Sequence, residues 1–211
     1  MNKDSILLVG AGGHAKACID IIEQEDRFII AGLIGAADQV GNQIYGYSVL
    51  ATDEELPHLS SHYKYALVAV GQIKTPKLRI HLFNLLEQAG FELPVIISPH
   101  AYISSHAVLN AGTIVMHGVM VNADASIGRN CILNSQSLVE HDVIIADHCH
   151  ISTAAIINGG VQVGEGTFVG SNSVIRESVK IGAHCVIGMG QQIFDNLTDN
   201  SVVGRKSSCA L

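Results

Sequence analysis

One histidine of this chain lies between two acidic residues, a setting that suits proton transfer. Glu140, His141 and Asp142 are consecutive, and His141 comes two residues after the apolar Val139. A neighbouring carboxylate fixes the tautomer of an imidazole and raises its basicity. Because a histidine that titrates near neutral pH is suited to general-base work, His141 is the first candidate for catalysis. The alternative is a solvent-exposed histidine with no catalytic role.

A glycine-rich turn offers a second kind of chemistry. Gly10-Ala11-Gly12-Gly13-His14 follows an apolar run at residues 5–9 and precedes a predicted helix over about 15–25. Glycines let backbone N–H groups approach an anion, and the helix N-terminus adds favourable partial charge. The turn therefore indicates a site for a nucleotide-linked or anionic sugar, or else a purely structural lobe. No acidic residue ends the second predicted strand, at Ile34-Gly35, where ribose binding would favour one.

The segments around this turn alternate between strands and helices. Strands are predicted over 5–9, 28–34 and 66–70, and helices over about 15–25 and 75–88. A looser segment covers 45–50, and a short helix is expected to begin at Thr52-Asp53-Glu54-Glu55. This order predicts a small parallel sheet with helices on its faces, a Rossmann-like domain over residues 1–95. We expect this domain to bind the sugar nucleotide.

The rest of the chain repeats with a period of six residues. Counting in sixes from Ile97, all 17 first positions are aliphatic: Ile97, Ile103, Leu109, Val115, Val121, Ile127, Leu133, Val139, Ile145, Ile151, Ile157, Val163, Val169, Ile175, Ile181, Ile187 and Ile193. Such a period is typical of a parallel β-helix, in which stacked coils bury one continuous aliphatic core. The next position is often Gly or Asn, as in Ile127-Gly128, which suggests positive φ at the corners. We therefore predict a β-helix domain over residues 96–211.

Composition limits the partners and the compartment. The net charge is -7, 15% of residues are charged and 48% are hydrophobic, with no basic run, so we expect neither nucleic acid nor membrane insertion. No signal-peptide pattern opens the chain, and the five cysteines form no Cys-x-x-Cys pair, so we predict a cytoplasmic protein without a metal site. Cys149 could serve as the nucleophile of a ping-pong reaction, but its hexad position predicts burial.

The hexapeptide repeats resemble those of hexapeptide-repeat acyltransferases, which implies a left-handed β-helix. The G-A-G-G-H turn, the leading lobe and Asn134-x-x-Ser137-x-x-Glu140-His141 together resemble one subgroup of these enzymes. That subgroup contains the bacterial sialic acid O-acetyltransferases and the N-acetyltransferases of nucleotide-linked 4-amino sugars. The resemblance covers essentially the whole chain. It implies acetyl-CoA as co-substrate, a role in surface glycan biosynthesis and a homotrimer with CoA between neighbouring β-helices.

The resemblance also implies roles for individual residues. His141 would be the catalytic base, with Asp142 increasing its basicity where N-acetyltransferases usually have Glu. The residues implied to contact acetyl-CoA are His150, Ser171 and Met189. Those implied to contact the sugar nucleotide are Gly12, Gly13, His14, Ile34, Gly35 and Gly71. The closing Gly-x-Pro-Ala segment of the family is replaced here by Gly204-Arg205-Lys206.

Three functions remain open at this point. The first is N-acetylation of the amine of a nucleotide-linked 4-amino-4,6-dideoxy sugar, by direct transfer from acetyl-CoA. The second is O-acetylation of a sialic-type sugar, which the segment from Asn158 to Gly170 also resembles. The third is a non-catalytic sugar-nucleotide-binding protein. The acid after His141 favours the first.

Overall fold

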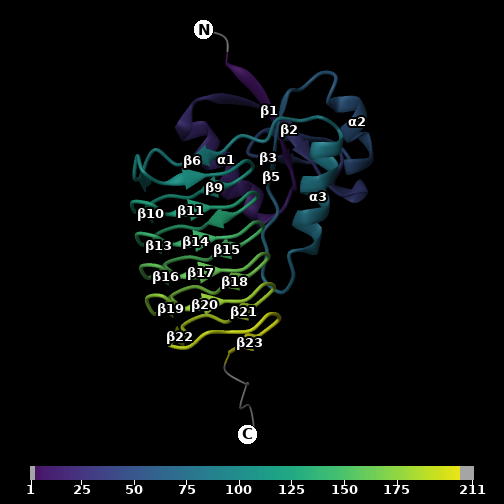
Figure 1. Cartoon of the computed structure of the whole chain (residues 1–211). Helices are drawn as coiled ribbons and strands as arrows, with labels where there is room; N and C mark the ends of the chain where they lie inside the picture. The colour runs from purple at the N-terminus through teal and green to yellow at the C-terminus, as the bar shows by residue number, and fades with distance from the viewer. Residues whose placement is uncertain (1–2, 205–211) are drawn as a thin grey trace, which may run out of the picture.

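A five-stranded sheet in the order β3-β4-β2-β1-β5 forms the core of the N-terminal lobe (Figure 1). The structure is a computed structural model that describes residues 3–204. Neighbouring strands of this five-stranded sheet are parallel, except for β3 and β4, which form an antiparallel hairpin. The elements of the lobe are β1 (Asp4–Val9), α1 (Gly13–Glu25), β2 (Phe28–Ile34), β3 (Gln43–Ile44), β4 (Tyr47–Ala51), α2 (Leu56–Leu59), β5 (Tyr65–Val68) and α3 (Lys77–Gln88), with 3₁₀ turns at Ala37–Gln39 and Asp53–Glu55.

The predicted elements of the lobe are present, with shifted ends. Helix α1 begins at Gly13, two residues before the predicted start, and β2 has the predicted bounds. Helix α3 begins at Lys77 because Pro76 disfavours helical geometry at the residue before it. The segment expected to be loose is instead strand β4, which pairs with β3 across a turn where Tyr45 and Gly46 both have positive φ.

The repeats fold into a left-handed parallel β-helix of two-residue strands. From β6 to β22, each strand pairs with the strand that lies 18 residues away, as Met120 does with Leu138, whereas β23 pairs with β21 at a shorter spacing. One face contains β7 (Tyr102–Ile103), β10 (Met120–Val121), β13 (Leu138–Val139), β16 (Ile156–Ile157), β19 (Val174–Ile175) and β22 (Gln192–Ile193). The second contains β8 (Val108–Leu109), β11 (Ser126–Ile127), β14 (Ile144–Ile145), β17 (Gln162–Val163) and β20 (Lys180–Ile181). The third contains β6 (Ile96–Ile97), β9 (Ile114–Val115), β12 (Ile132–Leu133), β15 (His150–Ile151), β18 (Phe168–Val169), β21 (Val186–Ile187) and β23 (Val202–Val203).

The aliphatic residue of each predicted hexad is the second residue of a strand. From Val115 to Ile193 these side chains are buried, and they form one continuous core inside the coil. Cys131, Cys149 and Cys185 are fully buried within it, as their hexad positions predict, and Cys18 is buried under the lobe sheet. The remaining cysteine, Cys209, lies outside the described residues.

The glycines that follow the aliphatic positions do not provide the positive φ expected of them. Positive φ instead recurs three residues after the aliphatic position, at every sixth residue from Gly112 to Gly190, Asp142 included. A Cβ on Gly164 would come within 2.5 Å of the backbone of the next coil, and one on Gly170 would do the same. These glycines therefore permit close stacking of successive coils, and the prediction that they form left-handed corners was wrong.

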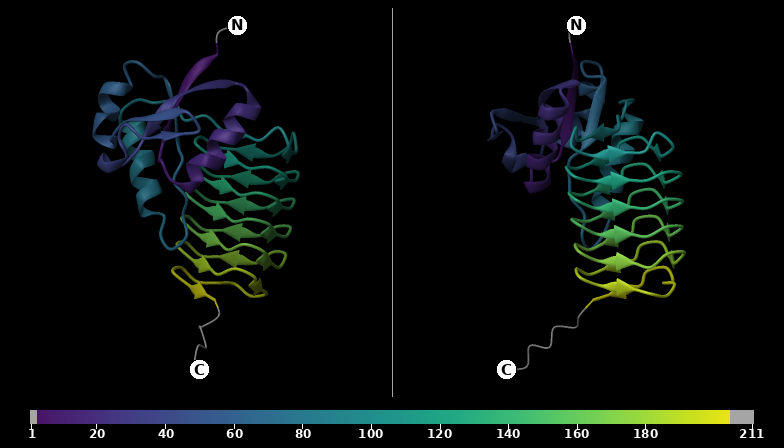
Figure 2. Two further views of the ribbon diagram at one scale, coloured as in Figure 1. Left: turned by 180° about the vertical axis from the view of Figure 1, so that it is seen from behind. Right: turned by 90° about the vertical axis from the view of Figure 1, so that its left-hand side faces the viewer.

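The lobe packs against the third face of the β-helix, and α3 runs alongside the coils (Figure 2). Arg79 of α3 is fully buried and donates to the carbonyl oxygens of Val70 and Asn130 and to Oδ1 of Asn130, at 2.8 Å for Oδ1. The segment between β5 and α3 extends down the coils, where Gln72 Nε2 donates to the carbonyl of Gly166 at 3.0 Å. The lobe is thus held at several coils. Within residues 3–204, no helix is long and apolar enough to cross a membrane.

Candidate active site

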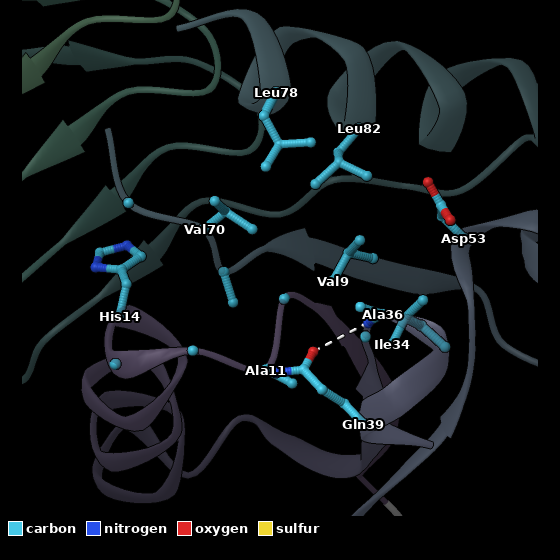
Figure 3. A pocket seen from close by; sticks show the side chains of 16 residues that line it. Val9, Ala11, His14, Ile34, Ala36, Gln39, Asp53, Val70, Leu78 and Leu82 are labelled. Carbon is cyan, nitrogen blue, oxygen red and sulfur yellow. Dashed lines mark hydrogen bonds between the residues drawn. The ribbon is translucent and has the colours of Figure 1, made fainter. Parts of the chain in front are cut away.

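The glycine turn forms one wall of a cavity in the lobe, with a volume of about 390 Å³. Because β1, β2 and β5 are parallel, their carboxyl ends meet at the edge where the turn connects β1 to α1. The structure brings all six residues predicted to contact the sugar nucleotide to this cavity, namely Gly12, Gly13, His14, Ile34, Gly35 and Gly71. Figure 3 shows the cavity with His14 at one end and Asp53 at the other.

His14 lies where the cavity meets the β-helix. Burial lowers the pKa of its imidazole to about 3, and nearby Arg79 and His150 contribute to the shift. Its Nε2 atom is buried and makes no hydrogen bond within the described residues. The side chain is therefore neutral at physiological pH and serves as an apolar wall with one unused polar atom.

The structure adds cavity residues that the sequence analysis did not assign. Leu78 and Leu82 of α3 cover one side, and Gln39 and Asp53 line the opposite end from His14 (Figure 3). The sequence pattern predicts Asp53 as part of a helix start, but in the structure it follows β4, a strand that lies next to β2 in the sheet. The position of an acid just after a parallel strand was the signal that could have identified it.

His141 and Asp142 form a hydrogen-bonded pair at a corner of the β-helix. The distance between His141 Nδ1 and Asp142 Oδ2 is 2.7 Å, so the shorter acid reaches the imidazole. Each side chain is 65% exposed. This hydrogen bond is the largest cause of a raised His141 pKa, and the negative charge of Glu140 adds to it. The arrangement leaves Nε2 free to accept a proton from a bound substrate.

One coil further on, a glycine makes room for this imidazole. A Cβ on Gly159 would lie 2.7 Å from His141 Cε1 and 2.8 Å from its Nε2. Any larger side chain there would displace the ring. The structure thus places Gly159 as a residue that positions the candidate base, a role that sequence spacing did not predict.

The three residues predicted to contact acetyl-CoA lie in two different places, two at the surface of the coil and one buried under the lobe. Ser171 and Met189 line an open depression of about 590 Å³ at the corner that follows the third face. His150 is instead buried under the lobe, where its Nδ1 donates to the carbonyl of Gln72 at 2.7 Å and burial lowers its pKa to about 4. Two separate polar contacts lie nearby: His150 Nε2 is 3.3 Å from Asn134 Nδ2 in the preceding coil, and Ser152 Oγ is 3.0 Å from Ser171 Oγ in the following one.

The lobe cavity and the candidate base are formed by different parts of the chain. Among the described residues, all those that line the cavity come from positions 9–82, and none comes from the β-helix. Cys149 is fully buried, with a pKa raised well above its ordinary value chiefly by desolvation, so it cannot act as a nucleophile. Among residues 3–204, no three His, Cys, Asp or Glu side chains are grouped so that they could hold a metal ion.

Comparison with known proteins places these features in a family. Residues 5–85 match the model of the PglD N-terminal domain, and residues 160–190 match that of the bacterial transferase hexapeptide repeats. PerB from Caulobacter crescentus, solved with CoA and GDP-perosamine, is 32% identical with a TM-score of 0.89, over 95% of this chain and 94% of that one. Structures of variants of this perosamine N-acetyltransferase with one histidine replaced by alanine or asparagine match equally well.

Two further relatives extend this comparison. The acetyltransferase domain of PglB from Neisseria gonorrhoeae, solved with acetyl-CoA, is 25% identical with a TM-score of 0.87, over 95% of this chain and 96% of that one. The GDP-perosamine N-acetyltransferase of Escherichia coli O157:H7 is 28% identical over 146 residues, which span 66% of this chain and 63% of that protein. With its lobe, its repeats and its likeness to PerB over nearly the full length of both chains, this chain belongs to the hexapeptide-repeat sugar N-acetyltransferases that carry a PglD-type N-terminal domain.

Proposed function

We propose that the protein transfers the acetyl group of acetyl-CoA to the amine of a nucleotide-linked 4-amino-4,6-dideoxy sugar. The observation that carries this proposal is the His141–Asp142 pair, with a 2.7 Å hydrogen bond and a free Nε2, on a β-helix of this family. Relatives named GDP-perosamine N-acetyltransferases support an amine as acceptor. In this proposal residues 1–95 bind the sugar nucleotide, and residues 96–211 bind acetyl-CoA and supply the base.

The proposed reaction is a direct transfer in a ternary complex. The sugar amine attacks the thioester carbonyl carbon, and His141 Nε2 accepts the proton that the nitrogen loses. The tetrahedral intermediate collapses, the C–S bond breaks, and the sulfur of CoA leaves as a thiol after protonation from the imidazolium. Asp142 stabilises the imidazolium between these steps. Binding both substrates side by side supplies the orientation that makes the attack fast.

Acetyl-CoA would bind at the corner depression of the β-helix, and the sugar nucleotide would bind in the lobe cavity. Ser171 and Met189 line a depression along one corner of the coil, which suits the extended chain of CoA, and His150 lies on the third face one coil before Ser171. In the lobe, Gly12, Gly13 and Gly71 would admit the diphosphate, with His14, Ile34 and Gly35 forming the walls. Arg205 and Lys206, which stand where the family has the Gly-x-Pro-Ala segment near the CoA adenine, lie outside the described residues.

A complete site requires a second copy of the chain, which supports the predicted homotrimer. No described residue of the β-helix lines the cavity, although the proposed base is on the β-helix. The outward side chains of the first face, from Tyr102 and Met120 through Leu138 and Ile156 to Val174, are apolar, and Tyr102 is 57% exposed. A continuous apolar face of this kind marks a protein–protein interface. We therefore propose active sites shared between neighbouring subunits, in a cytoplasmic enzyme.

Two alternatives are less well supported. O-acetylation of a sialic-type sugar would use the same base, but the named relatives of known substrate are N-acetyltransferases. A non-catalytic binder would have no need for an intact Glu140-His141-Asp142 corner or for the glycine that accommodates the ring.

The experiment is a thiol-release assay with acetyl-CoA and a panel of GDP-, UDP- and dTDP-linked 4-amino sugars, together with free and CMP-linked sialic acid. Release with an amino sugar supports the proposal, and release only with sialic acids selects the O-acetyltransferase alternative. The His141→Ala variant should lose roughly 10²–10⁴-fold in kcat while binding CoA normally. Unchanged turnover in that variant would contradict the assignment of the base.

A further inference from the structure

The lobe cavity contains one charged side chain whose role the proposed function leaves open. Asp53 lies at the end of the cavity away from His14 (Figure 3). Within residues 3–204, it is the only acidic or basic residue that lines the cavity, apart from the neutral His14. Its carboxylate accepts no hydrogen bond from any described residue, and the 3₁₀ turn that Asp53 begins has Thr52 as its N-cap, without a side-chain cap. It is therefore available to a ligand.

The layout of the cavity indicates which part of a nucleotide reaches Asp53. The diphosphate belongs at the glycine turn, because the backbone N–H groups and the start of α1 are there. A nucleotide continues from its phosphates through the ribose to the base, so the base occupies the far end. The walls between the two ends include Val9, Leu78 and Leu82, which suit the flat apolar faces of a base.

A carboxylate at the edge of a base distinguishes among the bases by their pattern of donors. Guanine has two adjacent donors, N1–H and the N2 amino group, and a carboxylate can accept both in a bidentate arrangement. Uracil and thymine have one N–H between two carbonyl oxygens, and the negative charge of a carboxylate would repel these oxygens. Adenine and cytosine place a ring acceptor beside their amino group. An anion at this place therefore favours guanine and disfavours the others.

Building on the function proposed above, we propose that Asp53 selects a guanine nucleotide by accepting hydrogen bonds from N1–H and the N2 amino group. Gln39 supports this geometry from the opposite wall. Its Oε1 accepts from the backbone N–H of Ala36 at 3.0 Å, which holds its carboxamide in place and leaves Nε2 as a donor toward the cavity. The substrate class is then a guanosine-diphosphate-linked amino sugar.

The test measures the binding of GDP, IDP and UDP to the full chain by calorimetry. Hypoxanthine in IDP lacks only the N2 amino group of guanine, so it isolates one hydrogen bond. Wild-type protein should bind GDP about tenfold or more tightly than IDP, and UDP weakest. The Asp53→Asn variant, similar in size and without a cap to lose, should weaken GDP binding and remove the preference over IDP. The Glu54→Gln variant, a neighbouring acid outside the cavity, should retain it.

Two results would overturn the inference. Equal binding of the three nucleotides by wild-type protein would show that no base is selected at Asp53. An equal loss for all three in Asp53→Asn would assign the carboxylate to the ribose, which they share. Because binding is measured without acetyl transfer, neither result depends on the reaction. Conversely, a protein that prefers GDP yet releases no thiol with any amino sugar would contradict the proposed function and leave the role of Asp53 supported.

Discussion

At the scale of single residues, the pair at the coil corner determines the pH range of the reaction. Asp142 raises the pKa of His141, and a base must be deprotonated to act, so activity should fall as the pH drops through that raised pKa. The Asp142→Asn variant removes the carboxylate, so the acid limb of the kcat/KM profile should move to lower pH. Activity at neutral pH should also drop roughly tenfold or more, because the ring loses its orienting partner.

A matched control for this prediction lies one coil earlier. Asp124 occupies the equivalent corner position, with φ of 60° compared with 59° for Asp142, but it has no neighbouring histidine. Asparagine tolerates this backbone conformation at both positions. The Asp124→Asn variant should therefore keep the wild-type profile. An acid limb that stays in place in Asp142→Asn would remove Asp142 from the mechanism.

Single residues also show where sequence reasoning succeeds and where it stops. His141 and Asp142 are adjacent in the chain, so their pairing could be predicted from spacing. Asp53 was missed although its place after a strand was a usable signal, whereas Arg79 could not be assigned, because what matters is the surface that it faces after folding. Arg79 looks like an ordinary helix residue, yet it is fully buried and hydrogen-bonded to Asn130, 51 positions away.

At the scale of elements, the hexad pattern predicted strands, faces and core, because few structures place an aliphatic residue at every sixth position over so long a stretch. The pattern did not show why glycine often follows the aliphatic residue of a hexad. A glycine is compatible both with positive φ and with close approach of backbones, and only the coordinates distinguish the two. The glycines after the strands proved to be of the second kind.

This distinction leads to a stability prediction. A Cβ on Gly170 would lie 2.5 Å from the carbonyl carbon of Gly188, whereas a Cβ on Gly204, the last position in the same column, meets nothing within 4 Å. The Gly170→Ala variant should lower the free energy of unfolding by about 1–3 kcal/mol, the usual cost of overpacking. Gly204→Ala should be nearly neutral. Chemical denaturation of both variants measures the difference, and equal stabilities would contradict the close-stacking explanation.

The seam between lobe and β-helix should make stability depend on pH. His14 and His150 have folded pKa values of about 3 and about 4, below the unfolded value near 6.5. Below pH 6.5 the unfolded state therefore binds more protons, and each histidine should lower the free energy of unfolding by about 1.4 kcal/mol per pH unit down to its folded pKa. Above pH 6.5 the effect vanishes.

Urea unfolding at several pH values tests this dependence. The His150→Gln variant should reduce the slope between pH 6.5 and about 4, even though it loses the bond to Gln72 and is less stable at pH 7. His58, an exposed histidine in the short helix α2, provides the control, because its replacement by Gln should leave the slope unchanged. A slope unaltered by His150→Gln would place the pH sensitivity elsewhere.

At the scale of the whole molecule, the separation of cavity and base predicts complementation between subunits. His141→Ala lacks the base, and Gly12→Asp should repel the diphosphate without a clash, since a Cβ there meets nothing within 4 Å. Each variant alone should be inactive. Trimers assembled from equal amounts of both should regain about a quarter of the wild-type activity, because a random quarter of the shared sites combine an intact base with an intact cavity.

Sedimentation analysis of the same samples supplies the control for assembly. A trimer that shows no recovery would place base and cavity in one chain, and a monomer would contradict the shared site altogether. The assembly itself could not be predicted from the repeat pattern, which is the same for an isolated coil. The apolar outward residues of the first face, such as Met120 and Leu138, become recognisable as a surface only once the coil is formed.

The 18-residue spacing between paired strands also determines which changes of length the chain can tolerate. An insertion or deletion of 18 residues between His141 and Ser171 adds or removes one coil and leaves every later side chain on its original face. A change of six residues keeps each strand intact but rotates everything beyond it by a third of a turn. It would move Ser171 and Met189 to another corner of the coil. Active variants of this protein that differ in the length of the β-helix should therefore gain or lose whole coils.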